Sequence, residues 1–533
     1  MADFHAVAEA SVDELLELAP EEATDLGDHR FDDRVWDRSF AAADAAVRQL
    51  RARQRELQGV DQSTLDPESQ VDAAMLTKQL ALRIFSYEEI REPAWNPLVY
   101  NPGDGLFVLL AQDTQPPETR MRGVCGRLEA IPRTVELALQ QLDNPPRIHV
   151  ETALQQHPGV ADLVRGDVAR LLSQVTDLAL RGRVERAQDR ALSAWESFGR
   201  FLEESLEKAS GDFRLGEPRF ARKLGLYLQS PLSPEEVVRR AAAELAATTE
   251  ELAEVAAELV GGGGSQHELI RRALDLVAEV RPSNETVLDE ARSALAQLTA
   301  AVGSSGLFTV PDDPYDVELM PEFMRGSPPV GCWGAGPFEE GAHSKVMISP
   351  TPDDWPTERS QSFYREFNSA DLVTDMAHEA MPGHVLQLSV ARRFRGPSRV
   401  RVAFPNNPFM EGWACHAEQI VAGLGLGGLH VRSQQLKGQL INSVNAILDS
   451  AVHAGEMGED EAITLITERG LQEPAVAQLK WRRACLTSGQ LSTYFVGYTE
   501  LQDLFESLAP IASYDEVLAH GSPPPSLLAG LLG

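Results

Sequence analysis

The 533-residue chain has few cysteines, a shortage of basic residues and no long hydrophobic run. Its four cysteines, Cys125, Cys332, Cys415 and Cys485, are far apart and form no CxxC pair. This spacing argues against a disulfide framework or a cysteine-rich zinc ribbon, and scattered thiols of this kind suit a reducing compartment.

Lys and Arg total 48 against 80 Asp and Glu, so the formal net charge is −32. A surface this acidic repels nucleic-acid phosphates and anionic lipids, and we therefore expect neither nucleic acid nor a membrane as a partner. The charge is explained either by solubility or by attraction of cationic substrates, and its total does not separate these two explanations.

Long apolar segments are also missing. No stretch approaches the roughly 18 apolar residues that cross a bilayer. The N-terminal segment MADFHAVAEASVDELLELAPEE carries acidic residues where a signal peptide has basic ones, and no long apolar segment follows. These features predict a cytoplasmic protein.

Helical patterning dominates the first 300 residues. Ser233 can cap a helix, Pro234 suits the first helical position, and Glu236 is placed to complete a capping box. Apolar residues then recur every seven positions, at Val238, Leu245, Leu252 and Leu259. Glycines 261–264 predict the end of this helix, and further helices are expected from about 266 and near 283.

Glycine, proline and aromatic residues cluster between about 303 and 360, where long helices are excluded. The segment 344–349, SKVMIS, is the best strand candidate of the chain. Helical patterning resumes from about 361 to about 508. We expect a helical region at 1–305 and a catalytic region at 306–533, or one continuous body formed by both.

The segment HEAMPGH begins like the HExxH zinc motif, in which two histidines four residues apart bind zinc and the glutamate activates water. Here the second histidine, His384, lies six residues after His378, about 240° around a regular helix. We expect Pro382 and Gly383 to break the helix and to bring His384 back toward His378. Taken alone, the pattern is explained equally well by capping or core histidines.

The downstream segment EGWACHAEQ places Glu411 and Glu418 seven residues apart on one helical face, with Cys415 between them. A His-His-Glu zinc site takes its third ligand from a second helix, and Glu411 fits that role. Glu418 could orient a ligand imidazole. Acidic residues on a helix are usually solvated, but the adjacent Trp413 indicates a buried stretch, where an isolated carboxylate is costly.

Two further pairs are weaker candidates. Tyr494 and Arg483, in RRACLTSGQLSTYFVG, could stabilise an oxyanion or anchor a substrate carboxylate. Asp449 and His453 lie four residues apart and could orient the site or bind substrate. For both pairs the alternative is a structural role on a packed helix.

Together these motifs resemble a large bacterial family known as a domain of unknown function, which carries an HExxPGH signature and is grouped with the gluzincin-like metallopeptidases. PEEATDLGDHRFDD resembles the opening of the family, HEAMPGHVLQ its signature, EGWACHAE its EGWAxYxE segment and GQLSTYFVG its GQAxxYxxG segment. EGWA also resembles the NEGFAxYxE segment of zinc aminopeptidases, in which the first Glu binds zinc. This resemblance implies Glu411 rather than Glu418 as the third ligand.

The resemblance implies a mainly α, metallopeptidase-like fold around a deep cleft, with a short β-sheet lining the active site. Residues 344–349 would be the edge strand, which could bind an extended peptide by strand addition. In the related dipeptidyl peptidase III family, one extra residue separates the zinc histidines, so the longer spacing here is no obstacle. Two positions depart from the family pattern: His416 replaces a Tyr, and Ser488 replaces the Pro before GQ.

The resulting hypothesis is a zinc-dependent hydrolase of peptide or amide bonds. One Zn2+ would be held by His378, His384 and Glu411, with Glu379 as general base and Tyr494 donating to the oxyanion. The remaining candidates would orient the ligands or contact the substrate, namely Glu418, Arg483, His453, Asp449 and His416.

Two alternatives stay open, a catalytically silent helical binding protein and a metal-dependent hydrolase of a non-peptide amide in specialised metabolism. Nothing in the sequence indicates an oligomeric state.

Overall fold

The computed structural model describes residues 3–111, 113–320, 325, 329–339, 341–511 and 513–532. These residues are mostly helical, which confirms the expected mainly α fold class. The chain divides into two compact units. Unit 1 comprises Met1–Phe213, Ala335–Ala342 and Pro397–Ala403, and unit 2 comprises Arg214–Gly334, His343–Gly396 and Phe404–Gly533.

This division differs from the boundary expected at 305/306. The helices between 214 and 305 belong to unit 2 because they pack on helices of the second half of the chain. The change in composition near 303, which suggested the boundary, marks the start of the loops and strands inside unit 2.

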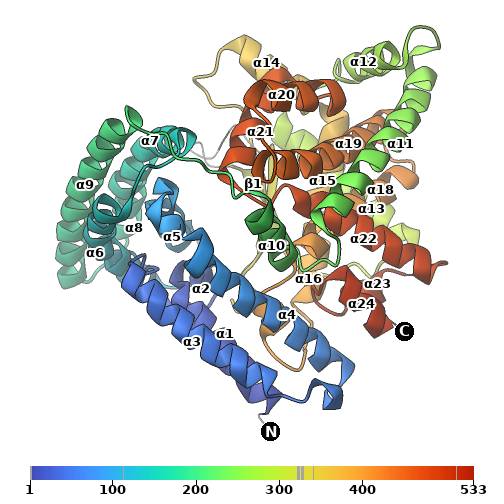
Figure 1. The fold of residues 1–533 in the computed structure, drawn as a ribbon. Helices are drawn as coiled ribbons and strands as arrows, with labels where there is room; N and C mark the ends of the chain where they lie inside the picture. Colours follow the sequence, from blue (N-terminus) through green and yellow to red (C-terminus); the bar gives the residue numbers. More distant parts are fainter. Residues whose placement is uncertain are drawn as a thin grey trace. The chain divides into compact units, whose positions relative to one another are not determined.

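The part of unit 1 before residue 214 is built mainly from long helices, drawn in blue to teal in Figure 1, in which α3 packs on α4 and α6 on α9. Its helices are α1 (Phe4–Leu18), α2 (Pro20–Asp25), α3 (Phe40–Gln58), α4 (Pro67–Phe85), α5 (Gly103–Ala111), α6 (Pro117–Gln141), α7 (Arg147–Asp162), α8 (Val168–Leu172), α9 (Leu178–Leu206) and α17 (Val400–Ala403).

Helix α9 shows why these segments fold as they do. The Asp177 side chain accepts hydrogen bonds from the backbone N–H groups of Ala179 and Leu180 and so caps the helix. The buried residues then recur every three or four positions and form one apolar stripe. They are Leu180, Val184, Ala187, Ala191, Trp195, Phe198, Gly199 and Leu202.

Two ionic contacts join segments of unit 1 that are far apart in the sequence. The Arg401 Nε donates to Asp72 Oδ1 at 2.6 Å, and both side chains are fully buried. His29 lies between two carboxylates: its Nδ1 is 2.9 Å from Asp32 Oδ2 and its Nε2 is 2.6 Å from Glu339 Oε2. A protonated imidazole donates to both carboxylates at once, which a neutral ring cannot do.

Unit 2 surrounds a second core. Its helices are α10 (Glu217–Tyr227), α11 (Pro234–Val260), α12 (Gln266–Val277), α13 (Val287–Ser305), α14 (Thr357–Glu366), α15 (Ser369–Glu379), α16 (His384–Ala391), α18 (Asn407–Gly423), α19 (Gly428–His453), α20 (Glu459–Thr464), α21 (Pro474–Leu486), α22 (Ser492–Leu508), α23 (Asp515–Leu518) and α24 (Pro525–Leu532).

The helix predicted from Ser233 is α11, which packs along α19. Ser233 caps it by accepting from the Glu236 N–H. The expected return bond of a capping box is absent from the described contacts, because the Glu236 carboxylate binds Arg239 and Arg240 instead. The reciprocal box occurs at the next helix, α12, between Ser265 and Glu268.

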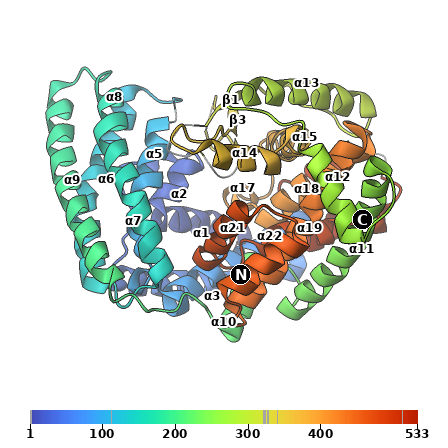
Figure 2. The same cartoon turned by 90° about the horizontal axis from the view of Figure 1, so that it is seen from above.

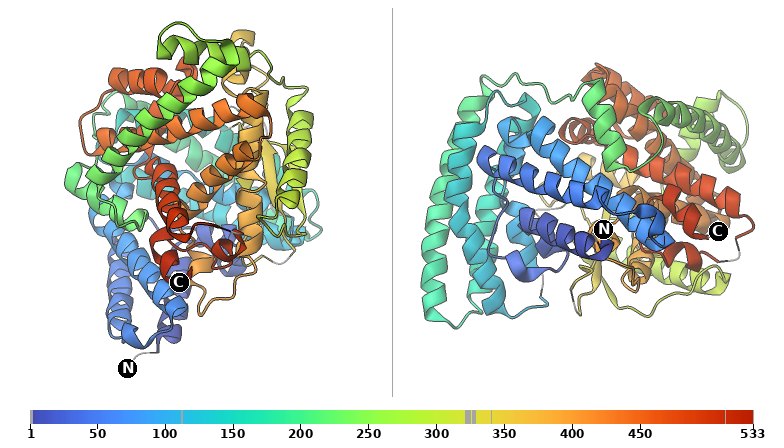
Figure 3. Two further views of the ribbon diagram at one scale, coloured as in Figure 1. Left: turned by 90° about the vertical axis from the view of Figure 1, so that its right-hand side faces the viewer. Right: turned by 60° about the horizontal axis from the view of Figure 1, so that its bottom comes forward.

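The sheet of unit 2 has three strands, β1 (Tyr315–Leu319), β2 (Val330–Trp333) and β3 (Ser344–Ile348), in the order β1-β3-β2. Strand β3 pairs with β1 in parallel and with β2 antiparallel. Figure 2 and the left panel of Figure 3 show α13 beside the strands. The segment 344–349 was expected at the edge, but β3 is the central strand, and its nearly continuous burial agrees with that position.

No helix among the described residues combines the length and apolar character needed to cross a bilayer.

The contact between His29 and its two carboxylates makes the stability of unit 1 depend on pH. The hydrogen bond to Asp32 raises the pKa of His29 from 6.5 to about 9 against the opposing effect of burial, and Glu339 adds to this. The folded-state pKa is raised, so the stabilisation is complete below about 6.5 and is lost as the pH rises through 9. We expect His29→Gln to lower the Tm by about 2–4 °C at pH 6 and to have little effect at pH 10.

Calorimetry between pH 6 and pH 10 measures this difference. His5→Gln is the matched control, because the ring of His5 contacts the backbone carbonyl of Pro397 rather than a carboxylate. A Tm difference that stays constant across the pH range would contradict the interpretation.

Candidate metal centre

The HEAMPGH segment forms the helix break predicted for it. Helix α15 ends at Glu379 and α16 begins at His384, with a cis peptide bond between Met381 and Pro382. Gly383 lies directly against the end of α15: its N–H donates to Ala377 O at 2.9 Å, and a Cβ at this position would lie 1.8 Å from His378 O. Only glycine fits there, so the sequence itself determines this break between the two helices.

The break turns His384 back toward His378, and the two rings lie 5.0 Å apart at an angle of 88°. Glu411, on α18, joins them: its Oε2 is 3.4 Å from His378 Nε2 and 3.6 Å from His384 Nε2. Metal bonds of about 2.0–2.1 Å in a tetrahedral site place neighbouring ligand atoms roughly 3.3–3.4 Å apart. The three side chains therefore fit a single divalent ion.

The protonation of these groups agrees with that fit. Glu418 Oε1 is 2.7 Å from His378 Nδ1, so Nδ1–H donates to this carboxylate and Nε2 is the atom that faces Glu411. Burial opposes ionisation of Glu411, but the hydrogen bonds from His378 and His384 outweigh it and lower its pKa. The 25% exposure of the Glu411 side chain leaves the cluster accessible to solvent.

Cys415 offers an alternative ligand set with His378 and Glu418. Burial raises the pKa of the Cys415 thiol to about 11, so it stays protonated, and its sulfur accepts a hydrogen bond from Asn442 Nδ2 at 3.2 Å. A thiol must lose its proton to bind a metal, which favours the set with Glu411.

Glu379 follows directly after the first histidine and faces the sheet. Its Oε2 accepts the Cys332 backbone N–H at 2.8 Å, on the side of β2 that is not paired with β3. Burial raises the pKa of Glu379. The sequence could not predict this contact, because a backbone N–H leaves no residue signature.

Glu411 is positioned by a close crossing of α18 and α22. A Cβ on Gly412 would lie 2.2 Å from Gly497 C, and a Cβ on Gly497 would lie 1.7 Å from Pro408 O. The neighbouring Trp413 is fully buried, and its Nε1 donates to Pro382 O at 3.0 Å. The EGWA segment is thus tied to α22 by its glycine and to the α15–α16 break by its tryptophan.

Tyr494 and Arg483 lie together near the cluster. Arg483 donates to the Tyr494 hydroxyl at 3.2 Å, and the Tyr494 ring is 6.5 Å from the His378 ring. Burial and then the charge of Glu411 raise the pKa of Tyr494, so its hydroxyl remains protonated and able to donate.

Asp449 and His453 are buried and hold the turn between α21 and α22. Asp449 accepts from the Gly489 and Ser492 N–H groups at 3.0 and 3.1 Å, and His453 Nε2 is 2.7 Å from Thr487 O. The structure therefore places this pair at the turn that precedes Tyr494, and not in contact with His378, His384 or Glu411.

The two departures from the family pattern fall at structural positions. His416 is buried on the opposite side of α18, where its Nδ1 accepts from Gln502 Nε2 and its Nε2 donates to the Tyr514 hydroxyl. Burial lowers the pKa of His416 to about 4, so the ring is neutral. The Ser488 hydroxyl accepts from Lys223 Nζ at 2.6 Å, which gives the turn a polar anchor in place of the family proline.

Two more acidic residues of α15, Asp371 and Asp375, are not among the site residues predicted from the sequence. They precede Glu379 by eight and four residues and share its helix face, a spacing visible in the sequence. Burial raises the pKa of Asp371 to about 7 and that of Asp375 well above its ordinary value, while the nearby charge of Lys437 lowers that of Asp371.

The model of the family described as "Bacterial protein of unknown function (DUF885)" matches residues 20–532. The chain belongs to this family. No curated protein matches it. Two solved structures share its fold: a candidate lipoprotein of unknown function from Shewanella oneidensis and a candidate lipoprotein from Colwellia psychrerythraea.

The first has a TM-score of 0.85 at 23% identity and covers 100% of both chains. The second has a TM-score of 0.81 at 18% identity and covers 99% of this chain and 97% of its own. An M32 carboxypeptidase from Deinococcus radiodurans R1 reaches a TM-score of only 0.34 at 12% identity, over 88% of this chain and 85% of its own, which is too low to show a shared fold.

The glycine crossing yields a test of how Glu411 is positioned. Gly497→Ala forces α18 and α22 apart, and we expect a loss of about 1–3 kcal/mol of stability together with weaker zinc binding. Gly423→Ala is the matched control, because a Cβ at that position meets nothing within 4 Å. Thermal unfolding and zinc titration of both variants measure the effect, and equal Tm values for the two would refute the crossing as a constraint.

The contact between Glu418 and His378 yields a second test. Glu418→Gln removes the negative charge that orients and polarises the imidazole, so we expect a 10- to 100-fold loss in zinc affinity. Competition with a coloured zinc chelator measures the affinity, and Glu456→Gln, at an exposed position, is the control. An unchanged affinity in Glu418→Gln would remove Glu418 from the site.

Proposed function

We propose that this protein is a metal-dependent hydrolase of peptide or amide bonds. The observation that carries the proposal is the convergence of His378, His384 and Glu411, with ligand-atom separations of 3.4 and 3.6 Å, beside the carboxylate of Glu379. A ligand set of this type with an adjacent, half-buried carboxylate is what hydrolysis by an activated water requires.

A divalent ion held by the three side chains, with Zn2+ the best match to two imidazoles and a carboxylate, supplies a Lewis acid and lowers the pKa of water toward about 7. Glu379 takes the proton of the attacking water and returns it to the leaving nitrogen. Its Oε2 is held by the Cys332 N–H, so Oε1 is the atom that accepts the proton. The pKa raised by burial suits a group that must both take up and release a proton.

Tyr494 donates its hydroxyl proton toward the oxygen that gains negative charge in the transition state. Arg483 donates to the same hydroxyl oxygen and so makes that proton more acidic. An extended substrate would lie along the outer edge of β2, rather than along β3 as the sequence suggested, because β2 is the strand next to Glu379.

Glu379→Gln tests the proposal. We expect the variant to keep one zinc per chain, because Glu379 is not in the ligand set. Its turnover should fall by about 100- to 10,000-fold, because the general base is gone. Metal analysis and mass-spectrometric digests of a peptide library give the two measurements. His384→Ala should lose the metal as well as the activity, and the exposed Glu358→Gln is the control.

Each failure points to a specific alternative. A protein that binds no transition metal after reconstitution would be a helical binding protein. Retained zinc with no cleavage in the peptide library, but with turnover of other amides, would place the activity on a non-peptide substrate. Full activity in Glu379→Gln would eliminate the proposed base.

A further inference from the structure

Helix α21 carries two cations, Lys480 and Arg483, that have no carboxylate partner among the described residues. Lys480 Nζ donates to Asn445 Oδ1 at 2.6 Å. Arg483 donates to Gln490 Oε1 at 3.1 and 2.7 Å and to the Tyr494 hydroxyl at 3.2 Å. In a chain with 80 acidic and 48 basic residues, two adjacent cations held only by neutral groups are unexpected.

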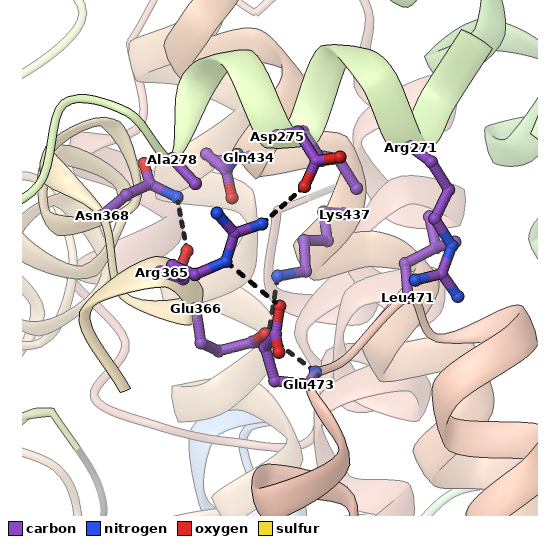
Figure 4. A pocket seen from close by; sticks show the side chains of 11 residues that line it. Arg271, Asp275, Ala278, Arg365, Glu366, Asn368, Gln434, Lys437, Leu471 and Glu473 are labelled. Atoms are coloured by element: carbon purple, nitrogen blue, oxygen red, sulfur yellow. Dashed lines mark hydrogen bonds and ion pairs between the residues drawn. The ribbon is translucent and has the colours of Figure 1, made fainter. Parts of the chain in front are cut away.

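A neighbouring polar pocket of unit 2, shown in Figure 4, gives the contrast. There Lys437 Nζ lies 3.0 Å from Glu366 Oε1, and Arg365 pairs with Asp275 at 2.5 Å and with Glu473 at 3.8 Å. The cations of that pocket therefore form ion pairs within the protein, whereas Lys480 and Arg483 form none among the described residues, and the charge of Glu366 reaches Lys480 only from beyond ion-pair distance.

The two cations face the same side of α21, because residues three apart in a helix are neighbours on its surface. Burial lowers the pKa of Lys480 to about 7; the charge of Arg483 adds to this effect and that of Glu366 opposes it. Holding a partly buried ammonium beside a guanidinium costs stability unless a negative group is supplied from outside. The side-chain amides of Asn445 and Gln490 orient both cations without neutralising them.

The position of this pair connects it with the proposed reaction. Arg483 touches Tyr494, whose ring is 6.5 Å from that of the candidate ligand His378. Asn445, which holds Lys480, lies one helical turn after Asn442, which contacts Cys415 on the helix of Glu411. Arg483 is also exposed, so a substrate can reach it.

We propose that Lys480 and Arg483 form a binding subsite for a carboxylate close to the scissile bond, and that this carboxylate is the free C-terminus of a peptide. A planar guanidinium with parallel N–H groups matches a carboxylate, and the ammonium adds a second charge. Every unmodified peptide has an α-carboxylate one residue beyond its last amide bond. The inference rests on the proposed hydrolase function and specifies it as removal of the C-terminal residue.

The test compares three pools of N-acetylated peptides of mixed sequence: one with free C-termini, one with C-terminal amides, and one amidated with glutamate as the last residue. Zinc-loaded wild type should release the last residue from the free-acid pool at least about 100-fold faster than from the plain amide pool. Arg483→Gln and Lys480→Gln should lower the acid-to-amide ratio of kcat/KM roughly 10- to 100-fold. Loss of the hydrogen bond from Arg483 to Tyr494 slows cleavage of both pools equally, so it does not change the ratio.

Arg482→Gln is the matched control, because it removes one positive charge from the adjacent position of the same helix, and its ratio should equal that of wild type. Binding gives a readout that does not depend on turnover. In equilibrium dialysis, Glu379→Gln protein should retain the free-acid pool in preference to the amide pool, and adding Arg483→Gln should abolish that preference.

Equal cleavage and equal binding of the acid and amide pools would overturn the subsite, as would ratios in Arg483→Gln and Lys480→Gln that match the control. Preference for the amidated glutamate pool over the free-acid pool would overturn the assignment to the C-terminus, because the carboxylate would then come from a side chain. Preferential binding of the acid pool without any cleavage would support the subsite while removing the hydrolase function.

Discussion

The crossing of α18 and α22 at Gly412 and Gly497 is the constraint on which the candidate centre depends. Two backbones in contact leave no room for adjustment, so the residue before Gly412, Glu411, and the residue three before Gly497, Tyr494, have fixed positions relative to each other. Trp413 extends the same constraint to the α15–α16 break by its bond to Pro382. Three short motifs that are distant in the sequence thereby become one rigid arrangement.

Charge forms a second layer around this arrangement. Asp371, Asp375 and Glu379 line one face of α15, and burial raises the pKa of each. Lys437, paired with Glu366, supplies positive charge near the start of this row. Of the cations on α21, Arg483 contacts Tyr494, and Lys480 lies within reach of the charges of Glu366 and Lys437. Acidic and basic groups therefore both lie around the candidate centre, and their charges act on one another.

Local chemistry decided which parts could be predicted from the sequence. Pro382 and Gly383 act within their own segment, so the helix break and the return of His384 followed from backbone rules. The convergence with Glu411 required a resemblance between motifs, because nothing local relates α15 to α18. The central position of β3, the Cys332 N–H at Glu379 and the burial of Asp449 and His453 against the α21–α22 turn depend on tertiary packing alone. The two units divide at 213/214 rather than at 305/306 for the same reason, because tertiary packing assigns the helices between these positions to unit 2.

The order of segments in the two units has a consequence for synthesis of the chain. Unit 1 contains Met1–Phe213 but also takes in Ala335–Ala342 and Pro397–Ala403. During synthesis on the ribosome, the contact of His29 with Glu339 therefore cannot form until residue 339 has been made. The contact of Asp72 with Arg401 cannot form until residue 401 has been made. At about 5–20 residues per second, the stretch from 214 to 401 takes roughly 10–40 s to emerge. During that time neither contact can form, so these two ionic links of unit 1 are completed only after most of the chain has been made.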